Sequence, residues 1–273
     1  MSTVHSNPQS NPQSNPQPAA QPTIYASLQG KRVFVTGGGS GIGADIVSAY
    51  ARQGALVTFA DRDVSASTQL VADLAGQVTA TPLFIACDLA EMDALRGAVA
   101  QAIAHFGDID ILVNNTANDE RHAFLNVTDA YFDAKMTINL KSAFFAAQAV
   151  MPGMLRRGGG AIINLGSTGW KNKVPGYAVY ATCKSAVNGL TRSLAREFGQ
   201  HQVRVNTLTP GWVMTPKQIE QWVDAEGERA MDQNQCLPGR IVGADIANMA
   251  LFLGANDSRM VTAQEFVVDA GWT

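Results

Sequence analysis

Short runs rich in β-branched residues alternate with stretches of helical periodicity along most of this chain. The expected strands are 33–36, 56–60, 83–86, 109–113, 161–165, 203–208 and 265–268, and the expected helices are 42–53, 64–75, 91–106, 128–155, 179–199 and 243–254. This rhythm is typical of βαβ units, in which right-handed crossovers join parallel strands. The sequence therefore predicts an α/β fold: a single doubly wound parallel sheet of seven strands with helices on both faces.

The beginning of the chain differs from the rest in composition. Residues 6–17 are three copies of Ser-Asn-Pro-Gln, and such a segment has no apolar side chains to bury. We therefore expect residues 1–27 to be a disordered tail. The remaining residues, 28–273, suit one domain, with 46% hydrophobic residues over the whole chain to supply its core.

Composition also argues against several classes of protein. A net charge of −3 without a basic block speaks against nucleic-acid binding. No run reaches the roughly 18 apolar residues of a membrane span, and no signal peptide is visible. Cys87, Cys183 and Cys236 lack Cys-x-x-Cys spacing, so we expect buried free thiols and a cytoplasmic protein. The histidines lack metal-ligand spacing, so we expect no metal site.

A glycine-rich segment follows the first expected strand and opens the first expected helix. Residues 36–43 read Thr-Gly-Gly-Gly-Ser-Gly-Ile-Gly. Glycines permit a tight turn and a close approach of the backbone to a pyrophosphate, and the N–H groups at a helix start attract its negative charge. A plain glycine-rich turn is the alternative. The position between strand and helix favours a Rossmann-like dinucleotide site.

An acidic residue ends the second expected strand. Asp61 lies 18 positions after Gly43, where a carboxylate can accept both ribose hydroxyls of the adenosine half. It would repel a 2′-phosphate about 4 Å away by roughly 1 to 4 kcal/mol per charge, which favours NAD over NADP. Two alternatives stay open, because Asp61 could be a solvated turn residue and Arg62 could clamp a phosphate.

The third and fourth expected strands also end in polar residues. Asp88, followed by Leu89, could bind the adenine amino group, or it could cap the helix that starts near Glu91. Asn115 lies in the run Asn-Asn-Thr-Ala at 114–117, where small and amide side chains can line the floor of a cofactor site.

Tyr180 and Lys184 lie four residues apart on an expected helix, so both side chains project from one face. A tyrosine pKa near 10 is too high for a base at neutral pH, but an adjacent ammonium and a positive nicotinamide can lower it. Lys184 could also hold the nicotinamide ribose. Ser167, 13 residues before Tyr180 and just past a strand, could bind the reacting oxygen; alone it would be read as a turn serine.

Two further features belong to the same pattern. Asn139 lies in the middle of an expected helix, where asparagine is a poor choice. It either caps a local irregularity or holds a water molecule that connects Lys184 to solvent. Pro210 and Gly211 end the sixth expected strand and would shape the loop around the nicotinamide amide.

These motifs together resemble those of the short-chain dehydrogenase/reductase family over roughly residues 28–273. The resemblance implies a dinucleotide-binding catalytic domain, a homotetramer, and a catalytic tetrad of Asn139, Ser167, Tyr180 and Lys184. The family's usual Asn-Asn-Ala-Gly reads Asn-Asn-Thr-Ala here, which adds bulk near the ribose. The residues expected to contact NAD are Gly37, Ser40, Gly41, Ile42, Gly43, Asp61, Asp88, Leu89, Asn115, Tyr180, Lys184, Pro210, Gly211 and Val213.

A polar run, Asn-Asp-Glu-Arg-His at 118–122, follows the fourth expected strand. Its Asp119 and Arg121 are two residues apart, so both can face inward along an extended loop and bind a polyol. A solvated surface loop is the alternative. Trp212 could form an apolar wall or pack in the core, and Gln218 could add an amide, within a segment, 212–240, that would cover the substrate. The expected substrate contacts are Asp119, Arg121, Ser167, Tyr180, Trp212 and Gln218.

Within the family, the runs at 118–122 and 235–242 resemble bacterial aldose 1-dehydrogenases of the D-xylose and L-arabinose type. This resemblance implies oxidation of the anomeric hydroxyl of an aldose to an aldonolactone, with Tyr180 taking the hydroxyl proton. Trp212 shifts the expected sugar towards L-arabinose, L-fucose or D-galactose and away from D-xylose.

Two other functions are compatible with parts of the sequence. One is an NADPH-dependent 3-oxoacyl thioester reductase, against which Asp61 and the polar run argue. The other is a non-catalytic dinucleotide-binding regulator, against which the complete Asn139, Ser167, Tyr180 and Lys184 set argues. The repeat at the start of the chain could also serve a membrane or scaffold role that leaves turnover unchanged.

Overall fold

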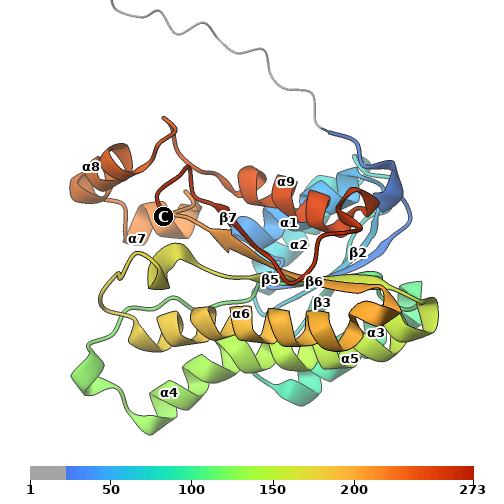
Figure 1. Ribbon diagram of the computed structural model, residues 1–273. Coiled ribbons are helices and arrows are strands. Elements are labelled where there is room, and N and C mark those ends of the chain that lie inside the picture. Colours follow the sequence, from blue (N-terminus) through green and yellow to red (C-terminus); the bar gives the residue numbers. More distant parts are fainter. Residues whose placement is uncertain (1–22) are drawn as a thin grey trace, which may run out of the picture.

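The computed structural model describes residues 23–273, and these form one α/β sandwich (Figure 1). Seven parallel strands lie in the order β3-β2-β1-β4-β5-β6-β7, which confirms the predicted doubly wound sheet. The strands are β1 (Arg32–Thr36), β2 (Leu56–Asp61), β3 (Leu83–Ala86), β4 (Ile111–Asn114), β5 (Gly160–Leu165), β6 (Val203–Pro210) and β7 (Glu265–Val268).

Helices cover both faces of this sheet (Figure 1). The helices of the described residues are α1 (Gly41–Arg52), α2 (Val64–Leu74), α3 (Met92–Phe106), α4 (Asp129–Met136), α5 (Ser142–Arg157), α6 (Ala178–Phe198), α7 (Pro216–Gln221), α8 (Ala225–Asn234) and α9 (Gly243–Gly254), of which α7 and α8 lie beyond the ends of the strands. In the described part of the chain, no helix combines the length and apolar character that crossing a bilayer demands.

The core has two layers because each central strand is buried on both sides. In β1, Val33 and Val35 pack in one apolar cluster with α1 and α9, while Phe34 faces a second cluster with α3 and α5. All three side chains are fully buried. This explains why the strands of this sheet read as continuous apolar runs rather than as alternating ones.

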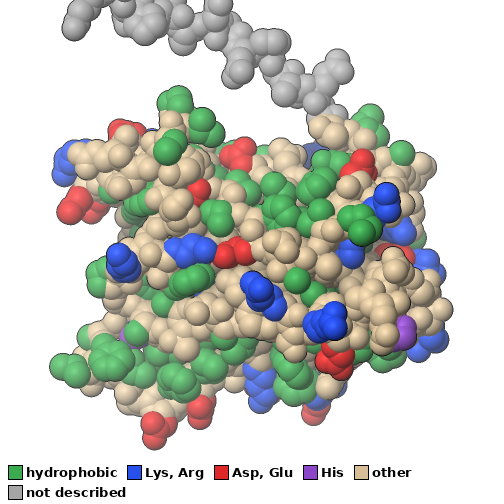
Figure 2. Space-filling model, viewed as in Figure 1, with side chains coloured by type: hydrophobic (Ala, Val, Ile, Leu, Met, Phe, Trp, Pro, Cys, Tyr) green, Lys and Arg blue, Asp and Glu red, His purple; other side chains and the backbone are tan. Residues whose placement is uncertain are grey.

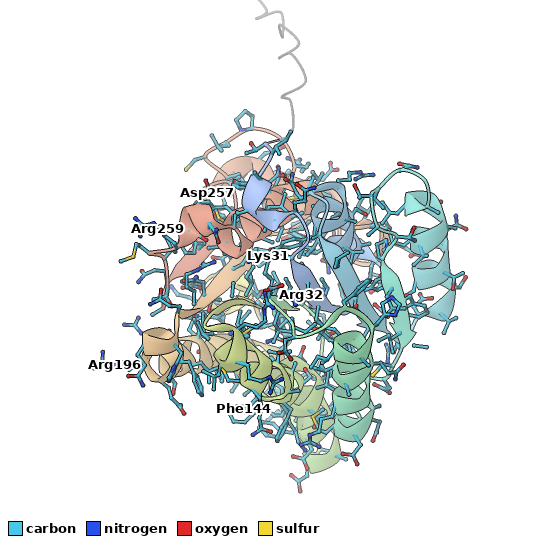
Figure 3. All side chains as sticks on the ribbon, turned by 90° about the vertical axis from the view of Figure 1, so that its right-hand side faces the viewer. Lys31, Arg32, Phe144, Arg196, Asp257 and Arg259 are labelled. Carbon is cyan, nitrogen blue, oxygen red and sulfur yellow. The ribbon has the colours of Figure 1, made fainter. Side chains whose placement is uncertain are left out.

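The two edges of the sheet differ in chemistry. At the edge where the strands begin, Asp110 accepts hydrogen bonds from Arg32 and Arg157, with its carboxylate 2.7 Å from Arg32 Nε and 3.0 Å from Arg157 Nε. Figure 3 labels Arg32 at this edge. These ion pairs fix the starts of β1 and β4 relative to α5. The opposite edge, where the strands end, carries the residues that the sequence singled out.

Two predictions about the organisation of the chain differ from the observed structure. The folded part begins before residue 28: Leu28 is fully buried, and the Tyr25 N–H donates to Gln53 Oε1 at 2.8 Å. The rest of the predicted tail, residues 1–22, lies outside the described residues. The segment 212–240, for which we predicted no helix, contains α7 and α8.

The expected helix 128–155 is divided into α4, one π-helical turn at Thr137–Lys141, and α5. The thiol prediction was wrong for Cys236, which is exposed, whereas Cys87 and Cys183 are buried free thiols. Cys236 lies after α8 on the covering segment and belongs to neither core cluster.

The turn between β1 and α1 depends on a close approach that only glycine allows. A Cβ added to Gly43 would collide with the Gly37 carbonyl oxygen and lie 2.7 Å from Asn115 Nδ2. Gly37 itself has a φ of +68°, in the region that favours glycine.

We predict that Gly43→Ala abolishes dinucleotide binding and lowers the free energy of unfolding by about 1–3 kcal/mol, because the backbone must move away. The matched control is Gly97→Ala in α3, where an added Cβ meets nothing within 4 Å. That change should stabilise the helix by about 0.5–1 kcal/mol. Denaturant unfolding and calorimetric titration with NAD measure both effects; normal NAD binding by Gly43→Ala would contradict the role of the turn.

Candidate active site

One cleft of about 710 Å³ lies at the edge where β1, β2, β4, β5 and β6 end. It crosses the point between β1 and β4 where the strand order reverses, the usual ligand position in doubly wound sheets. The predicted cofactor and substrate residues all line it: Gly37, Ser40, Gly41, Ile42, Gly43, Asp61, Asp88, Leu89, Asn115, Asp119, Arg121, Ser167, Tyr180, Lys184, Pro210, Gly211, Trp212, Val213 and Gln218. Asn139 does not line the cleft and lies behind it.

The glycine turn is braced by Asn115. Its Nδ2 donates to the carbonyl oxygens of Thr36 at 3.2 Å and Gly37 at 2.7 Å. The Asn115 N–H in turn donates to Thr36 Oγ1 at 3.0 Å. Glycine at 37, 41 and 43 keeps the cradle open, and the start of α1 presents N–H groups without intrahelical partners. These features fit the pyrophosphate of a dinucleotide.

Asp61 lies beside this turn at the end of β2. Its carboxylate accepts the Gly39 N–H at 2.8 Å and the Asp63 N–H at 2.9 Å, one on each oxygen. Each oxygen keeps room for a second donor, so the carboxylate can still accept a ribose hydroxyl. Asp88 borders the cleft as well, but its side chain accepts the Ala90 N–H at 2.9 Å, and Glu91 is the N-cap of α3. The helix-cap alternative for Asp88 is therefore not what the structure shows.

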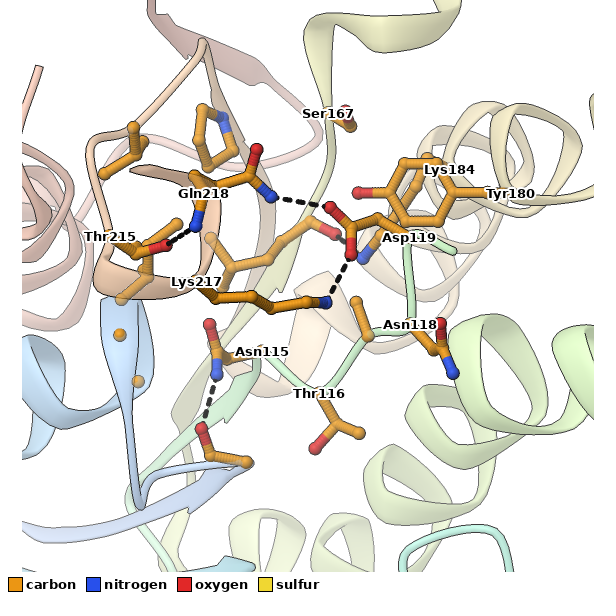
Figure 4. A pocket seen from close by; sticks show the side chains of 18 of the residues that line it. Asn115, Thr116, Asn118, Asp119, Ser167, Tyr180, Lys184, Thr215, Lys217 and Gln218 are labelled. Atoms are coloured by element: carbon orange, nitrogen blue, oxygen red, sulfur yellow. Dashed lines mark hydrogen bonds and ion pairs between the residues drawn. The ribbon is translucent and has the colours of Figure 1, made fainter. Parts of the chain in front are cut away.

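Tyr180 and Lys184 project from one face of α6 into the cleft, as their spacing predicts (Figure 4). The Lys184 Nζ lies 5.8 Å from the centroid of the Tyr180 ring and donates to the Leu165 carbonyl oxygen at 2.7 Å. Burial lowers the pKa of Lys184 to about 8. Ser167 Oγ accepts the Gly169 N–H at 3.1 Å, which fixes the hydroxyl at the end of β5.

The expected lowering of the Tyr180 pKa is not found in the protein alone. Burial raises the pKa of Tyr180 above its ordinary value, and the charge of Asp119 adds to the rise. Ser167 and Arg121 act in the opposite direction but do not outweigh burial. Ionisation of this phenol near neutral pH therefore needs a further positive charge in the cleft.

Asn139 occupies the π-helical turn between α4 and α5. Its Oδ1 accepts the Asn118 N–H at 2.8 Å, and its Nδ2 donates to the carbonyl oxygens of Asn118 at 3.1 Å and Lys135 at 3.0 Å. The first alternative, a local irregularity, is therefore what the structure shows: the amide binds the backbone of the polar run and fills the gap in the helix ladder.

Residues 118–122 form an extended loop whose side chains alternate in direction. Asn118 contacts the π turn through its backbone, whereas Glu120 and His122 contact α4 through their side chains. Lys135 Nζ donates to Glu120 Oε2 at 2.6 Å, and the Tyr131 hydroxyl lies 3.1 Å from His122 Nδ1. Asp119 and Arg121 line the cleft. The prediction that these two residues point inward is thus confirmed, and the loop is fixed from behind.

Asp119 is bound by residues of α7. Lys217 Nζ donates to Asp119 Oδ1 and Gln218 Nε2 donates to Asp119 Oδ2, both at 2.7 Å (Figure 4). The Gln218 Oε1 accepts from Trp212 Nε1 at 3.0 Å. Burial would raise the pKa of Asp119, but the hydrogen bond and charge of Lys217 hold it below its usual value.

Arg121 is held between two aromatic rings. Its guanidinium carbon lies 4.1 Å from the centroid of Tyr177 and 5.1 Å from that of Trp222, the residue after α7. One nitrogen donates to the Pro175 carbonyl oxygen at 3.3 Å. Such stacking orients a guanidinium and ties the covering segment to the loop.

For Trp212 the sequence left open an apolar wall of the cleft and packing in the core, and the structure combines the two. Its ring borders the cleft and lies 6.5 Å from the centroid of Trp272. The same ring packs under α8, because a Cβ added to Gly227 would approach it to 2.7 Å. It is thus both a wall of the cleft and part of the packing beneath the cover.

Comparisons with known proteins agree with this geometry. A family profile described as enoyl-(acyl carrier protein) reductase matches residues 37–273. The D-xylose 1-dehydrogenase of Caulobacter vibrioides is 45% identical over 249 residues, covering 91% of this chain and 98% of the relative. A protein of Rhizobium meliloti described as a probable galactose dehydrogenase is 40% identical, covering 90% and 96%.

Solved structures show the same fold. A short-chain alcohol dehydrogenase from Sinorhizobium meliloti superposes with a TM-score of 0.84 at 32% identity, covering 91% of this chain and 98% of that one. A blue fluorescent protein from a metagenomic library, solved with NADPH, gives 0.83 at 35% identity, covering 90% and 99%. The chain is a short-chain dehydrogenase/reductase.

Several lining residues of this dehydrogenase were not singled out from the sequence. Lys217 precedes Gln218 on α7, and Tyr177 precedes Tyr180 by one helical turn. Thr215 lies over the glycine turn, 3.3 Å from where a Cβ on Gly41 would be. The position of Lys217 next to the predicted contact Gln218 could have indicated that it lies near the cleft. Its ion-pair partner could not be found in this way, because Asp119 is 98 residues away from Lys217 in sequence.

Lys184 makes the stability of the cofactor-free dehydrogenase depend on pH. Burial lowers its pKa from 10.5 to about 8, so between these values the unfolded chain binds the proton and the folded chain does not. The wild type therefore loses stability as the pH falls through this window.

We predict that Lys184→Met removes this loss, so its free energy of unfolding rises relative to wild type as the pH falls from 10.5 to about 8. Turnover should fall by about a thousandfold, because the charge beside the phenol is lost. Urea unfolding at several pH values measures the first effect, and Lys141→Met, an exposed lysine, is the control. Identical pH dependence in wild type and variant would contradict the assignment.

Proposed function

We propose that this short-chain dehydrogenase/reductase uses NAD to oxidise the anomeric hydroxyl of an aldose to an aldonolactone. The observation that carries the proposal is the Asp119 carboxylate, which lines the same cleft as Tyr180 and Ser167 and is fixed there by hydrogen bonds from Lys217 and Gln218. A sugar offers several hydroxyls that can pair with such groups, whereas an acyl chain would leave them unpaired. The D-xylose and galactose dehydrogenases among the relatives support the same substrate class.

The residues of the cleft have distinct roles in this proposal. When bound, the nicotinamide accepts a hydride from the alcohol carbon. Tyr180 removes the hydroxyl proton, Ser167 donates a hydrogen bond to the reacting oxygen, and Lys184 supplies a positive charge beside the phenol. Since burial raises the pKa of Tyr180 in the protein alone, the charge of Lys184 and that of the oxidised nicotinamide ring must together favour the phenolate.

Asn139 acts through other groups. Its amide holds the backbone of Asn118, so it fixes the start of the loop that carries Asp119. The water-holding role that the sequence left open for this residue stays a prediction.

The preference for NAD is supported by Asp61. Backbone N–H groups of Gly39 and Asp63 hold the Asp61 carboxylate beside the glycine turn. A 2′-phosphate bound at this place would be repelled by the negative charge of the carboxylate. Arg62 also lines the cleft, so it is the residue that could offset this repulsion.

A homotetramer and a cytoplasmic location are part of the proposal. Apolar side chains gather over α4 and the turn before it in the space-filling view (Figure 2). In that turn Phe124 is 73% and Leu125 is 92% exposed. Such a surface suits contact with other subunits.

A substrate panel tests the reaction. NADH formation should be fastest with an aldose among L-arabinose, L-fucose, D-galactose and D-xylose, and Tyr180→Phe should lower kcat by about a thousandfold or more without weakening NAD binding. Faster NADPH-driven reduction of acetoacetyl thioesters than any aldose oxidation would replace the proposal by a ketone reductase. NAD binding without turnover of any substrate would favour a regulator.

A second experiment tests the cofactor preference. Asp61→Asn should raise the ratio of kcat/KM with NADP to that with NAD by about tenfold or more, since the repulsion on the 2′-phosphate is removed. Asp73→Asn, an exposed carboxylate on α2, is the control and should leave the ratio unchanged. A wild type that already prefers NADP would show that Arg62, rather than Asp61, governs the choice.

A further inference from the structure

The Asp119 carboxylate lies in the cleft at a place where a negative charge opposes ionisation of Tyr180. Asp119 is partly buried, and its charge raises the pKa of Tyr180, the phenol that must ionise in the proposed reaction. A negative group at this place therefore helps to bind a sugar but disfavours the phenolate form of Tyr180, which is the base in the proposed reaction. The arrangement works only if another residue offsets the charge.

Three cations lie near Asp119, and two of them are committed elsewhere. Lys184 donates to the Leu165 carbonyl oxygen at 2.7 Å. Arg121 is stacked between Tyr177 and Trp222 and donates to Pro175. The ion pair that Asp119 makes is with Lys217, at 2.7 Å, with the lysine side chain 53% and the aspartate side chain 29% exposed.

Gln218 completes the contact. It donates to the second carboxylate oxygen and is itself oriented by Trp212, so the carboxylate is fixed in direction as well as neutralised. Each oxygen then has one donor and can accept one more, which leaves two acceptor positions for neighbouring sugar hydroxyls. In Figure 4 the carboxylate is drawn between the Lys217 ammonium and the hydroxyl of Tyr180.

We propose that Lys217 is a positioning residue that neutralises and aims Asp119, so that a sugar-binding carboxylate can lie beside the catalytic phenol. This inference rests on the proposed aldose oxidation and adds a specificity-determining residue to it. Because Lys217 lies on α7, the same ion pair also holds the covering segment over the cleft.

The charged and titratable groups that face Tyr180 come from three parts of the chain. Asp119 and Arg121 face it from the extended loop, Ser167 from the end of β5, and Tyr177 and Lys184 from α6. Removal of Lys217 takes away none of these groups, but it breaks the ion pair with Asp119. The positive charge that offsets Asp119 is lost and the carboxylate is free to move towards the phenol, and both effects should disfavour the phenolate.

The experiment follows the ionisation of Tyr180 in the NAD complex by ultraviolet difference absorbance, wild type minus Tyr180→Phe, and repeats it in each variant background. Lys217→Met should raise the midpoint of the Tyr180 titration by about half a pH unit or more. The acidic limb of the profile of kcat/KM against pH should move to higher pH by the same amount. In an Asp119→Asn background, Lys217→Met should cause a clearly smaller shift, because the lysine's own field on the phenol is then the only effect lost and no carboxylate is left to position.

Steady-state kinetics provide the second readout. Lys217→Met should raise the sugar KM about five- to tenfold, with kcat at pH values above both midpoints changed less than twofold. Lys217→Arg should restore both properties. Arg229→Met removes a positive charge from the same segment, on α8 and exposed, and should behave as wild type.

The outcomes separate this inference from the proposed function. An unchanged midpoint in Lys217→Met, or a shift of the same size with Asp119→Asn, overturns the role of Lys217 even if the enzyme oxidises aldoses. Failure of the wild type to oxidise any aldose overturns the proposed function, and the titration then still shows whether Lys217 compensates Asp119.

Discussion

The site depends on parallel strands that all end at one edge of the sheet. Each crossover returns the chain to the same side, so the residues after β1, β2, β4, β5 and β6 meet around one cleft although they are up to about 170 positions apart in the chain. The close approach of Gly43 to the Gly37 carbonyl brings α1 against the end of β1. Asn115, which follows β4, then links that turn to the end of this neighbouring strand in the sheet.

Burial creates the chemical problem of this cleft. The same walls that exclude water raise the pKa of Tyr180 and lower that of Lys184. A buried phenol ionises only where positive charge compensates it, and a buried carboxylate persists only where it is paired. The ion pair of Asp119 with Lys217 satisfies the second condition, and in the proposed reaction the positive nicotinamide ring would contribute to the first.

The loop of residues 118–122, which lines the cleft, is fixed mainly by contacts on its other side. Glu120 binds the nearly buried Lys135, His122 lies against Tyr131, and Asn139 holds the Asn118 backbone from a π-helical turn. With the Glu120 and His122 side chains anchored to α4, Asp119 and Arg121 point the other way, into the cleft. The irregular turn in the helix thus helps to decide which side chains of the loop line the cleft.

The sequence by itself determined the sheet, the glycine turn, and the Ser167, Tyr180 and Lys184 set. These depend on local periodicity and on fixed spacings: continuous apolar runs specify buried strands, and a four-residue interval places two side chains on one helix face. The inward direction of Asp119 and Arg121 followed in the same way from the two-residue period of an extended chain.

Only the tertiary structure decided what these groups do to each other. The partner of Asp119 is 98 residues away, the rings around Arg121 come from two further segments, and the direction of the Tyr180 pKa depends on how deeply the phenol is enclosed. α7 and α8 were missed because short helices are stabilised by what they pack against rather than by their own periodicity. Long-range electrostatics and burial are properties of the folded cleft, and no local pattern encodes them.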